Sequence, residues 1–136
     1  MPVNTPDRTR SAAALDRLLQ GCDGVQAAMF ALRDGRPFVE KSRTKVEGGK
    51  LAAMTSSLVA LGKSVLRELK AGELDHVLIE GSTGKLVVSS VPDSGGLLIL
   101  AVLASSDARL GLVLGHSKMC AQAVAAASQD GAARSA

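Results

Sequence analysis

"LDHVLIEGSTGKLVVSSVPDSGGLLILAVLA", residues 74–104, contains three strand patterns in succession. LDHVLIE (74–80) and KLVVSSV (85–91) are separated by a short polar loop, and LLILAVLA (97–104) is apolar at every position. A strand without polar positions is expected to be covered on both faces. We therefore expect the third strand to lie in the middle of a sheet that has helices on both sides.

Two further strands are predicted upstream of this stretch, joined by a tight turn. VQAAMFAL (25–32) has the composition of a strand, and the Asp-Gly pair at 34–35 readily supplies the positive φ angles of hairpin turns. The following RPFVEK (36–41) contains Pro37, which has no N–H to donate to a ladder. This strand is therefore expected at a sheet edge.

Helical periodicity is present in three segments. A short helix is predicted over about residues 10–21, and a last helix follows the Ser/Asp capping residues at 105–107. The longest helix covers about residues 47–71, and Gly72 is predicted to close it. Its apolar residues recur every three or four positions and predict one buried stripe, formed by Leu51, Met54, Leu58, Leu61, Val65 and Leu69.

The elements follow one another in the order α-β-β-α-β-β-β-α. Hairpins combined with helices of this kind predict an α+β sandwich, in which an antiparallel sheet has helices on both faces. A chain of 136 residues is long enough for one such domain. We expect the domain to cover residues 11–127, with a flexible lead at 1–10 and a flexible tail at 128–136.

Composition argues against several classes of protein. The chain has 16 Lys and Arg against 13 Asp and Glu, and its only aromatic residues are Phe30 and Phe38. Proteins that bind single-stranded nucleic acids usually have a denser cationic surface and aromatic rings for base stacking. The sequence has no apolar leader and no segment of membrane-spanning length, which predicts a cytoplasmic protein. Cys22 and Cys120 are then expected to be reduced thiols; the alternative, a disulfide, requires their Cα atoms to lie within about 7 Å.

The loop EGSTGKL (80–86) contains a Gly-Lys pair, as phosphate-binding loops do. A P-loop requires G-x-x-x-x-G-K-[ST] between a strand and a helix. Here Ile79 occupies the position of the first glycine, Leu86 occupies the position of the hydroxyl residue, and a strand pattern follows. The sequence therefore predicts a hairpin loop and no nucleotide site.

No other segment contains a recognisable catalytic or metal-binding set, and no cofactor is predicted. His116 and Cys120 have a spacing that suits two metal ligands on one helix face, but no motif adds a third ligand from His76 or Cys22. No G-x-S-x-G nucleophile elbow is present. The stretch 33–50 is locally basic and is either a surface that attracts an acidic partner or a solvated strand and loop.

The outer face of the long helix lacks the charged residues that an exposed helix usually carries. Small residues line it instead, and Lys63, Arg67 and Lys70 are displaced to a flank. The small residues are Ala53, Ser57, Ala60 and Ser64. Such a row permits the close approach of another helix, although an inert Ala/Ser surface would have the same composition.

Three pieces of the chain together resemble the Roadblock/dynein light chain family. They are LDRLLQGCDGVQAAMFALRDGRPF (15–38), KLAAMTSSLVALGKSVLRELKAGELDHVLIEGSTGKLVVSSV (50–91) and LLILAVLASSDARLGLV (97–113). The resemblance covers about residues 12–126 and is to a stand-alone bacterial-type member. It implies a five-stranded antiparallel sheet with one long helix on one face and two terminal helices on the other, as in Roadblock and profilin-like folds. The low aromatic content and Pro37 depart from the family pattern and make the partner harder to predict.

The resemblance also implies a function without catalysis. Family members form homodimers or heterodimers through the third strand and the long helix, and their partners are typically Ras-like small GTPases, which they bind or regulate, or dynein subunits in eukaryotes. Carried over to this chain, it predicts a dimer and partner interface formed by Ala53, Ser57, Ala60, Ser64, Arg67, Asp75, Val77 and Ile79. The alternative function is a sensor domain that binds a small molecule, since α/β sandwiches of similar outline have that role.

Overall fold

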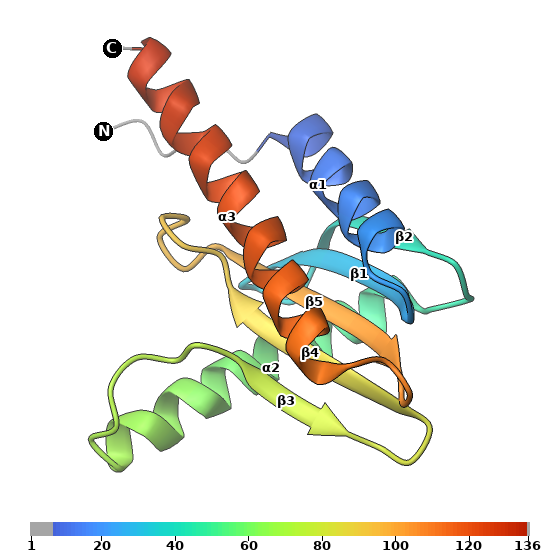
Figure 1. Ribbon diagram of the computed structural model, residues 1–136. Coiled ribbons are helices and arrows are strands. Elements are labelled where there is room, and N and C mark those ends of the chain that lie inside the picture. The colour runs from blue at the N-terminus through green and yellow to red at the C-terminus, as the bar shows by residue number, and fades with distance from the viewer. Residues whose placement is uncertain (1–6, 136) are drawn as a thin grey trace.

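Within residues 7–135, which the computed structural model describes, the chain forms three helices and one five-stranded sheet; side chains are described for residues 7–125. The helices are α1 (Arg8–Gly21), α2 (Gly48–Glu68) and α3 (Leu110–Ser135). The strands are β1 (Val25–Leu32), β2 (Pro37–Ser42), β3 (Val77–Glu80), β4 (Gly84–Ser90) and β5 (Leu98–Ser105). Neighbouring strands are antiparallel, in the order β2-β1-β5-β4-β3 (Figure 1). The predicted order of elements and the predicted sheet are confirmed.

β5 lies in the middle of the sheet, between β1 and β4. Its side chains alternate between two hydrophobic cores. Leu98, Leu100 and Val102 belong to the core beneath α1 and α3, whereas Ile99 and Ala101 belong to the core beneath α2. Since successive side chains of a strand point to opposite faces, a strand covered on both sides needs apolar residues throughout. The central position predicted for this strand is confirmed.

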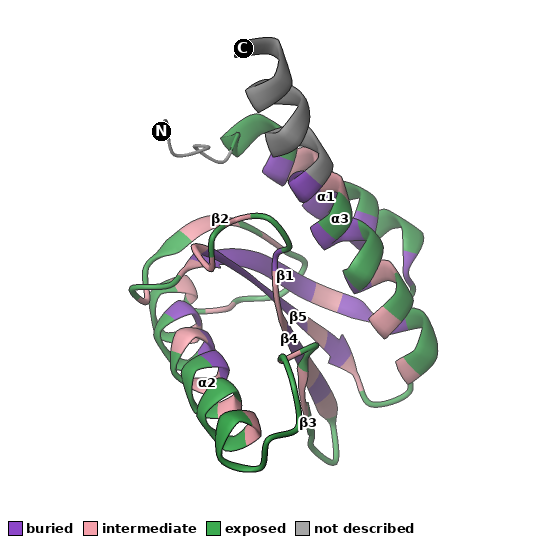
Figure 2. Ribbon diagram, turned by 90° about the vertical axis from the view of Figure 1, so that its left-hand side faces the viewer, coloured by how far each residue is buried: buried purple, intermediate pink, exposed green. Residues whose placement is uncertain are grey.

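The sheet is covered by α2 on one face and by α1 and α3 on the other (Figure 2). The larger core lies on the α1/α3 side, where Leu15 and Phe30 are fully buried. Val59 of α2 and Val88 of β4 contribute to the smaller core on the opposite face. One side of α2 therefore packs against the sheet, and the opposite side faces away from the molecule.

β2 and β3 are the two edge strands. Pro37 begins β2, in agreement with the predicted edge position. The connection between β3 and β4 is a tight hairpin in which Glu80 pairs with Lys85 and the N–H of Gly81 donates to the carbonyl of Gly84 at 2.7 Å. The hairpin interpretation of EGSTGKL is thus confirmed.

Two helix ends differ from those expected. α1 begins at Arg8 because the carboxylate of Asp7 caps the helix, accepting a hydrogen bond from the N–H of Arg10 at 3.1 Å. The rest of the expected lead, residues 1–6, lies outside the described residues. α3 continues to Ser135, past position 127, where the domain was expected to end. The alanine-rich sequence at this end has a high intrinsic helix propensity.

Lys70, not the predicted Gly72, occupies the left-handed position that closes α2. Its φ angle is 53°. The N–H of Lys70 donates to the carbonyl of Arg67 at 3.2 Å, and the N–H of Ala71 donates to the carbonyl of Leu66 at 2.9 Å. These two bonds form a Schellman motif, in which the residue after the C-cap adopts a positive φ angle.

α2 packs on the sheet through small and medium-sized residues. Ala52, Thr55 and Val59 are buried, and Gly62 lies on the same side of the helix. A Cβ atom added to Gly62 would lie 3.2 Å from Cγ2 of Val77, so the helix and the edge strand β3 are in close contact. Of the predicted leucine stripe, only Leu51 and Leu58 are half-buried and pack against this side of the sheet.

Thr55 offers a direct test of this packing. Its side chain is fully buried, and its Oγ1 atom has no hydrogen-bond partner within the described part of the chain. Burying an unpaired hydroxyl is unfavourable, and valine has nearly the same shape without it. We expect Thr55→Val to raise the free energy of unfolding by about 1 kcal/mol, measured by urea denaturation. Thr55→Ala, which also removes a methyl group, is the control and is expected to lower stability; a loss of stability in Thr55→Val would contradict the prediction.

Candidate partner-binding surface

A row of large apolar side chains is exposed along α2. Met54, Leu61, Val65 and Leu69 are between 46% and 67% exposed. The prediction that they form part of a buried stripe is therefore wrong. Their helical spacing was identified correctly, but the neighbouring sector with Ala52 and Gly62 permits closer contact with the sheet and takes the inner position. We call these four residues the apolar stripe.

The predicted row of small residues is also exposed and lies next to the apolar stripe on the outer side of α2. It consists of Ala53, Ser57, Ala60 and Ser64. The hydroxyl of Ser57 donates to the carbonyl of Ala53 at 3.1 Å, so it is satisfied within the helix. The outer side of α2 therefore presents apolar and small side chains over most of its length. A monomeric protein rarely exposes such a continuous surface without a function.

The edge strand β3 extends this surface. Val77 is half-buried and packs in the core beneath α2, and Ile79, two residues further along the same face, is 45% exposed. Ile79 is paired with Leu86 of β4, whose half-buried side chain packs against the same core. The apolar stripe of α2 and the α2-facing side of β3 thus lie on the same side of the sheet.

The backbone of β3 has one open side, because β4 is its only neighbour in the described sheet. The hydrogen bond between Gly81 and Gly84 fixes the alternation of the ladder. In an antiparallel pair, directly opposed residues alternate between bonded and non-bonded pairs. Leu78 and Glu80 therefore direct their N–H and C=O groups away from β4. An open edge of this kind is a template for pairing with another strand.

The structure brings together six of the eight predicted interface residues. Four are the small residues of α2, and Val77 and Ile79 belong to β3. Asp75 precedes β3, which begins only at Val77, because the chain between α2 and β3 has first to reach the sheet; Leu74 packs against the core on the way. Arg67 lies on the other flank of α2, where it lines a separate groove. The interface itself stays a prediction, to which the apolar stripe adds residues that sequence reasoning assigned to the core.

Lys85 of the rejected P-loop has a structural position. Its side chain is 8% exposed, and its Nζ atom donates to the carbonyl of Ala108 at 2.6 Å, in the turn before α3. Asp107 lies in the same turn. Its pKa is lowered mainly by a hydrogen bond from the side chain of Ser105, and to a smaller extent by the charge of Lys85. The lysine thus joins β4 to the β5–α3 turn, and its ammonium group is directed into the protein.

His116 and Cys120, the pair considered as metal ligands, are also held in packing positions, whereas His76 is exposed. The ring of His116 lies against Gly21, and Cys120 is buried in the core between α1, α3 and the sheet. In the described residues, no group of three His, Cys, Asp or Glu side chains is placed to hold a metal ion. None of the helices in this part of the chain has the length and apolar character needed to cross a membrane.

Cys22 and Cys120 are free, buried thiols with raised pKa values. Burial raises the pKa of Cys120 to about 12, and the nearby charge of Arg17 opposes this shift only in part. Because the thiolate is the reactive species, we expect iodoacetamide to modify neither cysteine in the native protein at pH 8 and both after unfolding, as measured by intact mass. The Cys120 thiol stays protonated in the folded state but ionises in the unfolded state above about pH 9, so its contribution to stability is lost as the pH rises toward 12. Rapid native labelling of Cys120 would contradict the buried position.

The fold defines a three-layer α+β sandwich whose long helix and edge strand are uncovered. Residues 12–104 match the Roadblock/LC7 domain. The chain belongs to the Roadblock/LC7 family, as the resemblance in its sequence predicted.

Solved structures support the same fold. MglB of Myxococcus xanthus is 19% identical, with a TM-score of 0.82 and coverage of 96% of both chains. A Roadblock/LC7 domain from Streptomyces avermitilis is 23% identical, with a TM-score of 0.75 and coverage of 83% of this chain and 92% of that one. A structure described as MglB with tetrameric arrangement is 20% identical, with a TM-score of 0.80 and coverage of 90% of both chains. No curated protein sequence matches the chain.

Proposed function

We propose that this chain is a non-enzymatic, dimeric adaptor that binds or modulates a Ras-like small GTPase in the cytoplasm. The observation that carries the proposal is the apolar stripe of α2 beside the open edge of β3. Both features call for a second surface of matching chemistry, one through apolar side chains and the other through backbone hydrogen bonds.

A second copy of the chain meets both requirements. Complete burial of a Leu, Val or Met side chain is worth roughly 1.5–3 kcal/mol, so covering the stripe provides a substantial driving force. The small residues beside it permit close approach of the second α2. In a two-fold arrangement the same patch lies on both subunits, and antiparallel pairing of two β3 strands would extend the sheet across the dimer.

Family membership supports the choice of partner. The resemblance to Roadblock proteins implies a Ras-like small GTPase, and structural neighbours include a gliding protein, MglB, from Thermus thermophilus. Another neighbour has a tetrameric arrangement, so association of subunits is compatible with this fold. Catalysis by the chain itself is not part of the proposal, because the ionisable groups described above have structural positions.

The mass of the protein in solution tests the dimer. Light scattering coupled to size exclusion is expected to give twice the chain mass of 13.9 kDa at micromolar concentration. Hydrogen exchange should find the amides of Leu78 and Glu80 protected, although in the β3–β4 ladder both amides point away from β4. A stable monomer, or rapid exchange at both amides, would contradict pairing through β3.

Binding to a GTPase is tested separately. A Ras-like GTPase from the same cell, loaded either with GDP or with a non-hydrolysable GTP analogue, is titrated with the chain by calorimetry. A regulator that distinguishes the two states should prefer one of them by roughly tenfold or more, which corresponds to about 1.4 kcal/mol. Absence of binding to either form would leave the dimer intact but remove the GTPase from the proposal.

A further inference from the structure

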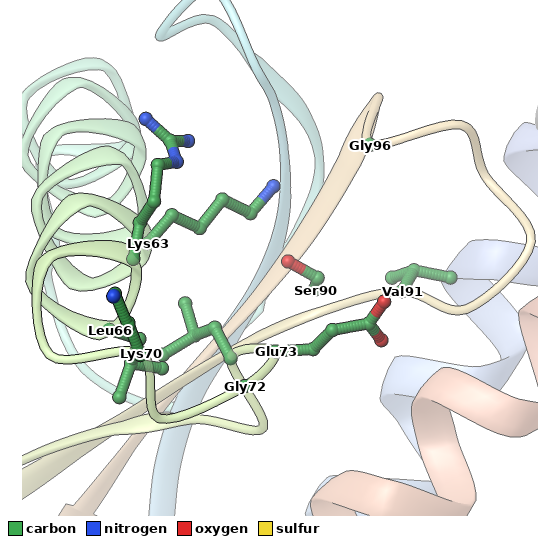
Figure 3. Close-up of a pocket in the computed structure, with 10 residues that line it drawn as sticks. Lys63, Leu66, Lys70, Gly72, Glu73, Ser90, Val91 and Gly96 are labelled. Carbon is green, nitrogen blue, oxygen red and sulfur yellow. The ribbon is translucent and has the colours of Figure 1, made fainter.

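A groove of about 670 Å³ lies beside the C-terminal half of α2, on the flank opposite the apolar stripe. One wall is the helix and the segment that follows it, and the other is the end of β4 with the β4–β5 loop (Figure 3). Half-buried Leu66 and Leu74 and buried Val91 supply apolar surface, and Gly72 and Gly96 leave backbone accessible.

Positive charge dominates this groove. Lys63, Arg67 and Lys70 line it from α2, against the single carboxylate of Glu73. None of these three cations takes part in a salt bridge among those found in the described residues. Figure 3 shows the side chain of Lys63 reaching from the helix toward Ser90 across the groove.

The backbone at Lys70 is a second, independent observation. A lysine with a φ angle of 53° occupies the position where glycine is the usual residue. Residues other than glycine, asparagine or aspartate are uncommon in this conformation, and such outliers concentrate at functional sites. Here the conformation places a cationic side chain at the end of the groove, where glycine would have closed the helix without one.

The spacing of the cations indicates the shape of the ligand. From Lys63 to Lys70 the helix rises by about 10 Å, and Arg67 lies about 6 Å along this line. A single phosphate group is too small to contact cations at both ends of such a row. An extended peptide advances about 3.3 Å per residue and its alternate side chains point to one side. Carboxylates at positions one, three and five therefore face the same side over about 13 Å, a span that the long Lys and Arg side chains can match.

We propose that this groove binds an extended acidic segment of a partner protein, with carboxylates on Lys63, Arg67 and Lys70 and an apolar residue on Leu66 and Leu74. This inference does not depend on the dimer, because the groove and the apolar stripe lie on different flanks of α2. It assigns a binding partner to the three cations that line this flank of α2.

Fluorescence anisotropy with a short labelled peptide tests the proposal. The peptide carries aspartates at positions one, three and five and a leucine at position two, and the comparison peptide has asparagine in place of each aspartate. The variant Lys63→Gln/Arg67→Gln/Lys70→Gln is expected to weaken binding of the acidic peptide roughly tenfold, the loss expected for three exposed ion pairs. Added salt should weaken binding to the wild-type protein as well.

A control variant has the same change in net charge at exposed lysines elsewhere, Lys45→Gln/Lys50→Gln/Lys118→Gln. It is expected to retain binding within about twofold. Equal loss in both variants, or equal binding of the asparagine peptide, would overturn the proposal. Displacement of the peptide by inorganic pyrophosphate at comparable affinity would also overturn it, in favour of a small-anion site.

The variant Lys70→Gly separates binding from folding. Glycine adopts the positive φ angle without strain, so the melting temperature is expected to rise while peptide affinity falls roughly two- to threefold. A variant that is more stable and binds the peptide as tightly as the wild-type protein would remove Lys70 from the site. Lower stability would contradict the strained conformation on which this step rests.

Discussion

Replacing Leu61 with glutamate is expected to turn the proposed dimer into a monomer at micromolar concentration. Leu61 is 63% exposed in the isolated subunit, so the substitution leaves the fold of each subunit intact. In the dimer the same position would be covered, and covering an unpaired carboxylate is strongly unfavourable. A rise of at least about a hundredfold in the dissociation constant, roughly 3 kcal/mol, should follow in a dilution series by light scattering or sedimentation.

Met119 provides a matched control, because it is also 63% exposed but lies on α3, on the opposite side of the sheet. Met119→Glu is expected to leave the mass of the dimer unchanged. Circular dichroism should find both variants as folded as the wild-type protein. If Leu61→Glu remains dimeric, or if both substitutions dissociate the protein equally, the dimer does not form through α2.

Replacing Gly24 with alanine is expected to destabilise the fold by about 3 kcal/mol. Gly24 has a φ angle of 91°, and an added Cβ would lie 2.7 Å from the Cβ of Ala108 and 3.0 Å from the Oγ of Ser105. The turn after α1 therefore meets the β5–α3 turn where no side chain fits, and the carbonyl of Gly24 also accepts a hydrogen bond from the N–H of Ser105 at 2.8 Å. Such a loss is a large part of the stability of an ordinary domain.

Gly72 separates the two causes of this effect. It has nearly the same φ angle, 93°, but nothing lies within 4 Å of an added Cβ. Gly72→Ala should therefore cost only the conformational strain, about 1 kcal/mol. Urea denaturation at fixed protein concentration measures both variants, since dimerisation makes stability concentration-dependent. Equal losses at the two glycines would contradict the close contact between Gly24 and Ala108.

The sequence predicted the architecture well wherever one pattern had only one interpretation. The unbroken apolar run at 97–104 requires cover on both faces, and it is the central strand. The failed P-loop comparison correctly left EGSTGKL as a hairpin loop. Pro37 predicted an edge strand because its missing N–H is a local chemical fact that the rest of the fold does not alter.

The inner face of α2 could not be predicted from the same kind of evidence. Periodicity identifies a stripe, but α2 has two neighbouring stripes with helical spacing, one of large residues and one containing Ala52, Thr55, Val59 and Gly62. Hydrophobicity alone favours the large residues. The close approach of helix and sheet at Gly62 decides for the small ones, and that distance is a property of the assembled layers. A glycine within a long helix was the available signal, since it costs helix stability unless close packing requires it.

The groove was missed for a related reason. Lys63, Arg67 and Lys70 were recognised as a cationic flank, but Ser90 and Gly96 come from a distant part of the sequence. The packing of α2 on β4 and β5 brings the loop between these strands opposite the helix. Lys70 was not predicted to close α2, because Gly72, two positions further on, is the more usual type of residue at a helix C-terminus.

The central position of β5 has a consequence for how the protein is made. β5 is the last strand along the chain, yet it joins the β1–β2 hairpin to the β3–β4 hairpin, and its pairs include Val25 with Ala104. Contacts between residues so far apart in sequence form slowly, because a long loop must close first. During synthesis, we therefore expect β1 and β4 to remain unpaired on the side that faces β5 until residue 105 has left the ribosome. A chain interrupted before that point lacks the central strand, so its unpaired strand edges are expected to favour aggregation.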